Sequence, residues 1–155
     1  MKTASRLSIC IGLIITLIGT LPAYTADSLY GTITEVKSGT VVFMKFGGEL
    51  HELRLIGIEV PDDSTIQEKA TEFVSALVLG KSARMRFMGG AADGAFMVRL
   101  FTDDPDFGIE DVAVELVRAG WAIPNPGFEF KYGELADAER EARDSGRGIW
   151  ADGRR

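Results

Sequence analysis

Three segments rich in β-branched and aromatic residues follow one another between residues 29 and 58, and they constrain the fold more than any other feature. Residues 29–36 (LYGTITEV) and 40–46 (TVVFMKF) are separated by KSG, which suits a tight turn. Two glycines follow, and residues 49–58 (ELHELRLIGI) alternate before becoming fully apolar, as a strand does on passing from an edge into a core. The sequence therefore predicts a three-stranded meander at the start of the fold.

The hydrophobic period changes after Pro61, where a helix is predicted. Apolar residues recur at helical spacing from Ile66 to Leu77, Ser64 or Thr65 can cap the start, and Gly80 can end the helix. Two more strands are predicted at residues 82–88 and 95–101, around the turn GGAADG, and residues 103–108 (DDPDFG) have the composition of a loop.

Two helices are predicted near the end of the chain. Residues 110–120 (EDVAVELVRAG) show one apolar side and end at Gly120. Residues 130–146 are more polar, with Glu139 and Arg143 spaced for an i,i+4 ion pair and a narrow apolar stripe of Tyr132, Leu135, Ala136 and Ala142. The resulting order, β-β-β-α-β-β-α-α, is the order of a five-stranded OB-fold barrel with added helices, an α+β fold.

Residues 1–26 have the composition of an export signal. Lys2 and Arg6 precede an apolar run at residues 7–21, and no acidic residue occurs before Asp27. The run is shorter than the roughly 20 apolar residues that a membrane span needs. We expect residues 1–26 to be an export signal peptide and residues 27–155 to be one exported domain, periplasmic or secreted. Both candidate cleavage sites, after residues 23 and 26, lack a small residue three positions back, so an uncleaved anchor formed by residues 7–23 stays open.

Removal of this segment changes the composition of the domain. Cys10 is the single cysteine of the chain, so the mature domain has no thiol for a disulfide or for catalysis. The 17 basic residues fall to 15 against 23 acidic ones, which makes the net charge −8. Because a polyanion binds to clustered Lys and Arg, this balance predicts weak nucleic acid binding at most.

Three motifs carry a resemblance to a known family: RLIGIEVP at residues 54–61, VELVRAGWA at residues 114–122 and AEREARDSGRGIW at residues 138–150. With them, the chain resembles the staphylococcal nuclease-like (thermonuclease) family over residues 29–150. The resemblance implies an OB-fold with helices packed around the barrel. In active members it also implies Ca²⁺-dependent hydrolysis of phosphodiester bonds in DNA or RNA.

The resemblance implies which positions would carry that chemistry. Arg54 matches the first phosphate-binding arginine. Thr40 stands at one metal-binding aspartate, and Glu59 matches the other with one methylene more. Asp62 matches the general-base glutamate with one methylene less. Ala95 stands at the second arginine.

These replacements predict impaired catalysis. Phosphodiester hydrolysis needs a cation or arginines to neutralise developing charge and a base to activate water, and Ca²⁺ needs several hard oxygen ligands. Losing one transition-state donor typically costs about 10²- to 10³-fold in rate. We therefore expect a binding or interaction module for a protein or ligand partner, without a cofactor.

Other interpretations stay open. A Ca²⁺-dependent nuclease would need a second basic group near the barrel mouth, for which Lys37, Lys45 and Arg99 are candidates, and an uncleaved anchor would make the domain a membrane-tethered adaptor. Simpler roles compete for single residues. Arg54 can pair with Glu59 or Asp62 instead of a phosphate, residues 61–63 (PDD) can be turn residues that start a helix, and His51 is expected to be exposed. Both tryptophans, Trp121 and Trp150, are expected in the core.

Overall fold

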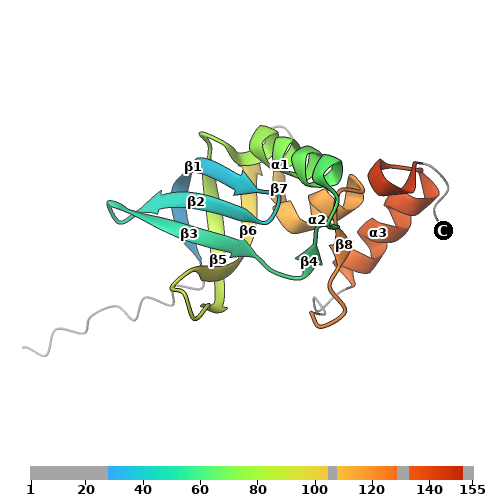
Figure 1. Ribbon diagram of the computed structural model, residues 1–155. Coiled ribbons are helices and arrows are strands. Elements are labelled where there is room, and N and C mark those ends of the chain that lie inside the picture. Colours follow the sequence, from blue (N-terminus) through green and yellow to red (C-terminus); the bar gives the residue numbers. More distant parts are fainter. Residues whose placement is uncertain (1–27, 105–107, 129–132, 152–155) are drawn as a thin grey trace, which may run out of the picture.

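The computed structural model describes residues 28–104, 108–128 and 133–151, which form a β-barrel with helices packed on one side of it (Figure 1). Strands β1 (Leu29–Ser38), β2 (Val41–Phe46) and β3 (Glu49–Leu55) are the predicted meander. Strands β5 (Ser82–Gly90) and β6 (Phe96–Asp104) form the predicted hairpin. The predicted strands of the OB-fold are confirmed.

Parallel pairing of β3 with β6 closes the barrel. The strands run in the order β3-β2-β1-β5-β6, and Leu53, Arg54 and Leu55 lie opposite residues 96–98 of β6. Alternate side chains point inward, as they must in a small barrel. The fully buried interior includes Ile33, Val42, Met44, Leu53, Met85, Val98 and Leu100.

Helix α1 (Ser64–Val78) covers the barrel at the end where β1 and β2 meet, and Ala70, Val74 and Val78 are its buried residues. Its N-cap is Asp63, not Ser64 or Thr65 as predicted. The Asp63 carboxylate accepts hydrogen bonds from the Thr65 and Ile66 amides at 2.9 and 3.1 Å. A carboxylate one residue earlier satisfies the free amides of the first turn and also suits the helix dipole.

Helix α2 (Val112–Arg118) packs against α3 (Glu134–Asp144). The Glu139–Arg143 pair of α3 is confirmed at 2.8 Å. The predicted apolar stripe of α3 was partly wrong, because Ala138 is buried and Ala136 is exposed, while Tyr132 lies outside the described residues. No helix in the described part of the chain is long and apolar enough to cross a membrane, and the predicted export signal lies outside that part.

Short strands appear where the sequence predicted loop or helix. The third predicted strand divides at Gly57, whose φ is +82°, and β4 (Ile58–Glu59) pairs with β8 (Ile123–Pro124). Strand β7 (Gly108–Asp111) pairs with the outer half of β6, where a loop was predicted; residues 105–107 lie outside the described range. These pairings depend on a partner distant in sequence or on a free sheet edge, which local periodicity does not reveal.

His51 is partly buried instead of exposed. Its ring stacks on Phe46 at 3.9 Å and on Phe96 at 5.3 Å between ring centroids. His51 lies opposite the buried Met44, so its side chain is on the inner face of the barrel wall. The prediction of exposure was wrong because the strand register places residue 51 on that face.

Two of the sequence motifs meet at a pair of glycines. Gly120 and Gly148 have φ of +78° and +54°, and the Ile149 amide donates to the Gly120 carbonyl at 2.9 Å. A Cβ at Gly148 would collide with the backbone of Gly120, so this contact admits glycine alone. Both tryptophans were predicted in the core, and both are only partly buried. Trp121 packs against the core, and the Arg143 guanidinium lies 4.2 Å from the ring centroid of Trp150.

We expect Gly148→Ala to lower the free energy of unfolding by about 3 kcal/mol or more, because positive φ and backbone overlap both oppose the new methyl group. Gly80→Ala is the matched control: Gly80 has a φ of +75° but nothing lies within 4 Å of the added Cβ. It should cost only about 1–2 kcal/mol. Urea unfolding of both variants measures the difference, and equal losses would contradict the assigned role of the Gly120–Gly148 contact.

Candidate functional site

An open groove of about 1030 Å³ lies where the β1–β2 turn, the end of β3, strand β4 and one face of α1 meet. Thr40, Arg54 and Glu59 line it, so the fold brings together three of the four predicted site residues. Asp62 is not among the lining residues. The groove therefore contains most of the residues that were predicted to form the site.

The turn that carries Thr40 is fixed by its contact with α1. A Cβ added at Gly39 would lie 2.7 Å from the Ala70 Cβ, so glycine lets the turn pack directly on the helix. The Thr40 amide donates to the Ser38 hydroxyl at 3.3 Å, and the two hydroxyl oxygens are 3.5 Å apart. At this position the groove therefore has a neutral hydroxyl, which lies close to the hydroxyl of Ser38.

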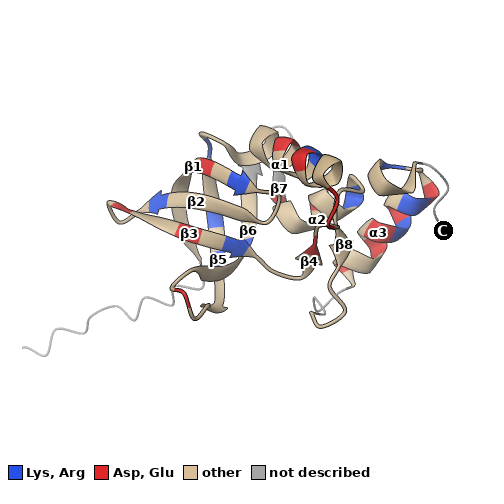
Figure 2. Ribbon diagram, viewed as in Figure 1, with Lys and Arg blue, Asp and Glu red and all other residues tan. Residues whose placement is uncertain are grey.

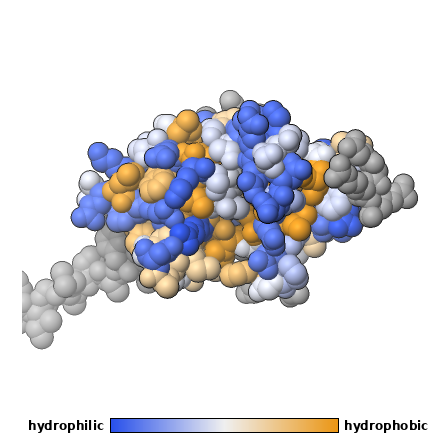
Figure 3. Space-filling view, in the orientation of Figure 1, coloured by the Kyte–Doolittle hydropathy of each residue, from blue (hydrophilic) through white to orange (hydrophobic). Residues whose placement is uncertain are grey.

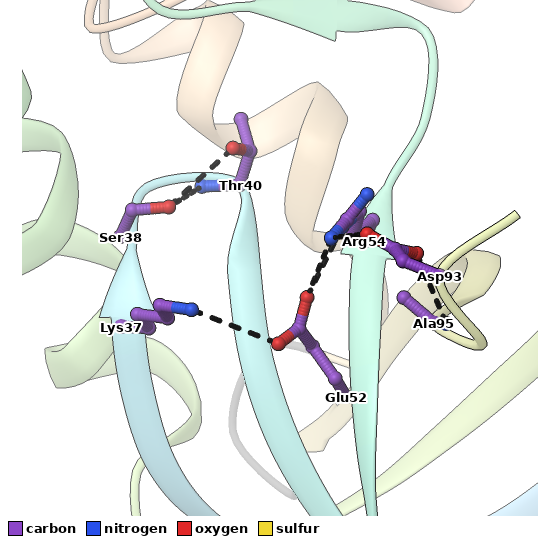
Figure 4. Close-up of polar contacts among 7 residues, drawn as sticks. All are labelled: Lys37, Ser38, Thr40, Glu52, Arg54, Asp93 and Ala95. Carbon is purple, nitrogen blue, oxygen red and sulfur yellow. Dashed lines mark hydrogen bonds and ion pairs between the residues drawn. The ribbon is translucent and has the colours of Figure 1, made fainter. Parts of the chain in front are cut away.

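Arg54 is bound by carboxylates of its own chain (Figure 4). Its Nε and Nη2 donate to the same oxygen of Glu52 at 3.1 and 2.9 Å, and Nη2 donates to Asp93 at 2.5 Å. Lys37 lies 3.7 Å from the other Glu52 oxygen. The predicted pairing of Arg54 with Glu59 or Asp62 was wrong.

Both partners of Arg54 have a physical explanation. Glu52 precedes Arg54 by two residues and therefore points to the same face of β3. Asp93 is in the turn between β5 and β6, and closure of the barrel by β3 and β6 brings that turn beside Arg54. The hydrogen bond to Glu52, with that to Asp93, holds the pKa of Arg54 above its ordinary value, and the bond from Arg54 holds the pKa of the Asp93 carboxyl below its ordinary value.

Neither of the two altered acids, Glu59 and Asp62, pairs with Arg54. Glu59 is exposed on β4, and no cation of the described chain lies within ion-pair distance of it. Asp62 accepts a hydrogen bond from the Gln67 side chain at 3.3 Å, beside the Asp63 cap. The interpretation of residues 61–63 as the start of a helix is confirmed by that cap.

Among the described residues that line the groove, Arg54 is the one arginine. Ala95 is only 4% exposed, and its amide donates to Asp93 at 3.3 Å. Of the three candidate replacement cations, Lys37 alone lines the groove, where it faces Glu52. Arg99 is held elsewhere by Asp111 and Glu134, each at 2.6 Å.

The residues present do not match a Ca²⁺ site. Calcium takes six to eight oxygen ligands, normally with several carboxylates among them. The positions expected to bind it provide one neutral hydroxyl, Thr40, and one exposed carboxylate, Glu59. Across residues 28–104, 108–128 and 133–151, no group of three or more His, Cys, Asp or Glu side chains is placed to hold a metal ion.

Comparison with known proteins agrees with this fold. Residues 52–152, about two thirds of the chain, match the family model described as staphylococcal nuclease homologue. The chain belongs to this family. It is also 24% identical over 154 residues to the uncharacterized protein MJ1439 of Methanocaldococcus jannaschii, an alignment that covers 81% of this chain and 73% of that protein.

Membership of this family establishes the fold of the protein but not its activity, because one fold can carry many functions. The matched region contains Arg54, Glu59, Asp62 and Ala95, whereas Thr40 precedes it. The sequence did not identify Glu52 and Asp93, the two residues that accept hydrogen bonds from Arg54. Glu52 was visible as a same-face neighbour of Arg54, but no local signal identified Asp93.

We predict that an NMR titration of Asp93 will give a pKa below the ordinary aspartate value, and that Arg54→Ala will raise it again. A lowered pKa means that this ion pair stabilises the fold at pH values above the ordinary pKa of aspartate. The stabilisation is lost as the pH falls through the lowered pKa of Asp93. Lys37→Ala is the control, because it removes a cation from Glu52 and not from Asp93. An Asp93 pKa that does not respond to Arg54→Ala would show that the pair is not formed in solution.

Proposed function

We propose that this staphylococcal nuclease homologue is an exported binding module that does not hydrolyse phosphodiester bonds, and that its partner is a protein or a small ligand. One observation carries the proposal. Arg54, the single arginine kept from the implied catalytic set, is engaged by Glu52 and Asp93, while Ala95 stands at the second arginine.

A phosphate would meet unfavourable conditions at Arg54. The Nε and Nη2 groups of Arg54 already donate to Glu52 and Asp93, so the negative charge of a bound phosphate would lie close to two carboxylates. The developing charge of the transition state would lack a second donor, and each lost donor typically costs about 10²- to 10³-fold in rate. The loss of the metal carboxylate at Thr40 adds to this cost.

The implied base is also altered. Asp62 is one methylene shorter than glutamate and accepts a hydrogen bond from Gln67 at 3.3 Å. Proton transfer through a water molecule depends on sub-ångström placement, so we expect the shorter side chain to lower the rate further. The site therefore favours binding over hydrolysis.

Hydrolysis of single-stranded DNA and of RNA by purified residues 27–155 tests this proposal. Product formation is measured with Ca²⁺ and with chelator, and Arg54→Ala serves as the control for contaminating nucleases. We expect no cleavage above that control. Ca²⁺-dependent cleavage that disappears in Arg54→Ala would overturn the proposal and establish the nuclease alternative.

Export has its own test, the intact mass of the protein recovered from cells that express the full chain. We expect a mass that lacks residues 1–26, because the apolar run is too short for a typical membrane span. A mass that includes residues 1–26, together with recovery from the membrane fraction, would instead support an anchor formed by residues 7–23.

A further inference from the structure

The groove is acidic on the side formed by β4 and α1. Glu59 is on β4, and Glu68 and Glu72 are four residues apart on the face of α1 that lines the groove. Figure 2 shows acidic residues on β4, on the turn after it and on α1. Glu72 pairs with Lys69 at 2.7 Å, whereas no cation of the described residues lies within ion-pair distance of Glu59 or Glu68.

The opposite side of the groove offers little free positive charge. Lys37 and Arg54 are its basic lining residues, and both face carboxylates of the chain. Glu52 is shared between them, and Asp93 adds a second negative charge at Arg54. An incoming ligand therefore meets net negative charge, the reverse of what a phosphate site presents.

The groove also contains apolar surface. Val41, Leu55, Ile58 and Val60 are among its lining residues. Figure 3 shows apolar atoms exposed beside the hydrophilic band over β4 and α1. Lysine and arginine side chains combine an apolar stem with a charged end, so they can cover such a surface and still reach a carboxylate. A volume of about 1030 Å³ accommodates more than one side chain.

We propose that this groove binds a basic, extended peptide segment of a partner protein, with lysine or arginine side chains facing Glu59 and Glu68. The inference rests on the proposed loss of hydrolysis, because it assigns a new ligand class to the same groove. The net charge of −8 on residues 27–155 further favours approach of a cationic partner.

Fluorescence anisotropy with a fluorescein-labelled hexalysine peptide tests this assignment. The barrel, its core and all described helices lie within residues 28–151, so residues 27–155 are the protein to use. The groove variant combines Glu59→Gln, Glu68→Gln and Glu72→Gln. The matched control combines Glu35→Gln, Glu49→Gln and Asp144→Asn, which changes the net charge equally at exposed positions outside the groove.

We expect the groove variant to lower the affinity for hexalysine about tenfold or more, because three carboxylates that would pair with lysine side chains are neutralised and each exposed ion pair contributes modestly. The control should lower this affinity about twofold or less, because its three positions make no contact with a peptide in the groove. Binding should weaken as salt is raised, because these charges are screened. Melting temperatures of both variants should match the parent, which separates lost contacts from lost structure.

Two outcomes of the anisotropy experiment would overturn the inference: no binding of hexalysine, or an equal loss of affinity in both variants. A third would be displacement of the peptide by millimolar inorganic phosphate, together with a shift of the Arg54 backbone amide signal in the NMR spectrum. None of these outcomes would be evidence that the protein hydrolyses phosphodiester bonds. Absence of peptide binding together with absence of cleavage would reject this inference alone, whereas Ca²⁺-dependent cleavage would reject the proposed function.

Discussion

The parallel pairing of β3 with β6 is the constraint on which both fold and site depend. It joins strands that lie more than 40 residues apart and turns an open sheet into a closed barrel, which removes two exposed edges. The same pairing carries the β5–β6 turn to the end of β3. Asp93 reaches Arg54 because the barrel is closed at this place, so the electrostatics of the groove follow from backbone topology.

In the assignment proposed for the groove, a few side chains change the ligand that the fold selects. A phosphate site needs positive charge that is free to meet the ligand, and here Glu52 and Asp93 use that charge within the chain. Glu59 on β4 and Glu68 and Glu72 on α1 then make the electrostatic potential of the groove negative. The proposed change of ligand class requires no change in the barrel, which agrees with the general separation of fold from function.

Much of the fold was predictable because local patterns agree with the final packing. Alternation at residues 29–58 and helical spacing after Pro61 identified the main elements, and the motifs around Gly120 and Gly148 pointed to the right family. The short strands β4, β7 and β8 were missed, since two-to-four-residue segments have no period of their own. His51 was misplaced for a related reason: a one-residue difference in register exchanges the two faces of a strand.

By itself, the sequence determined the order of the main elements and the OB-fold, because residue type and spacing are local properties. Tertiary structure alone decided that Arg54 pairs with Glu52 and Asp93 rather than with Glu59 or Asp62. Ion pairs form between groups that the fold brings within about 4 Å of each other. That distance depends on strand register and barrel closure, which are properties of the whole chain.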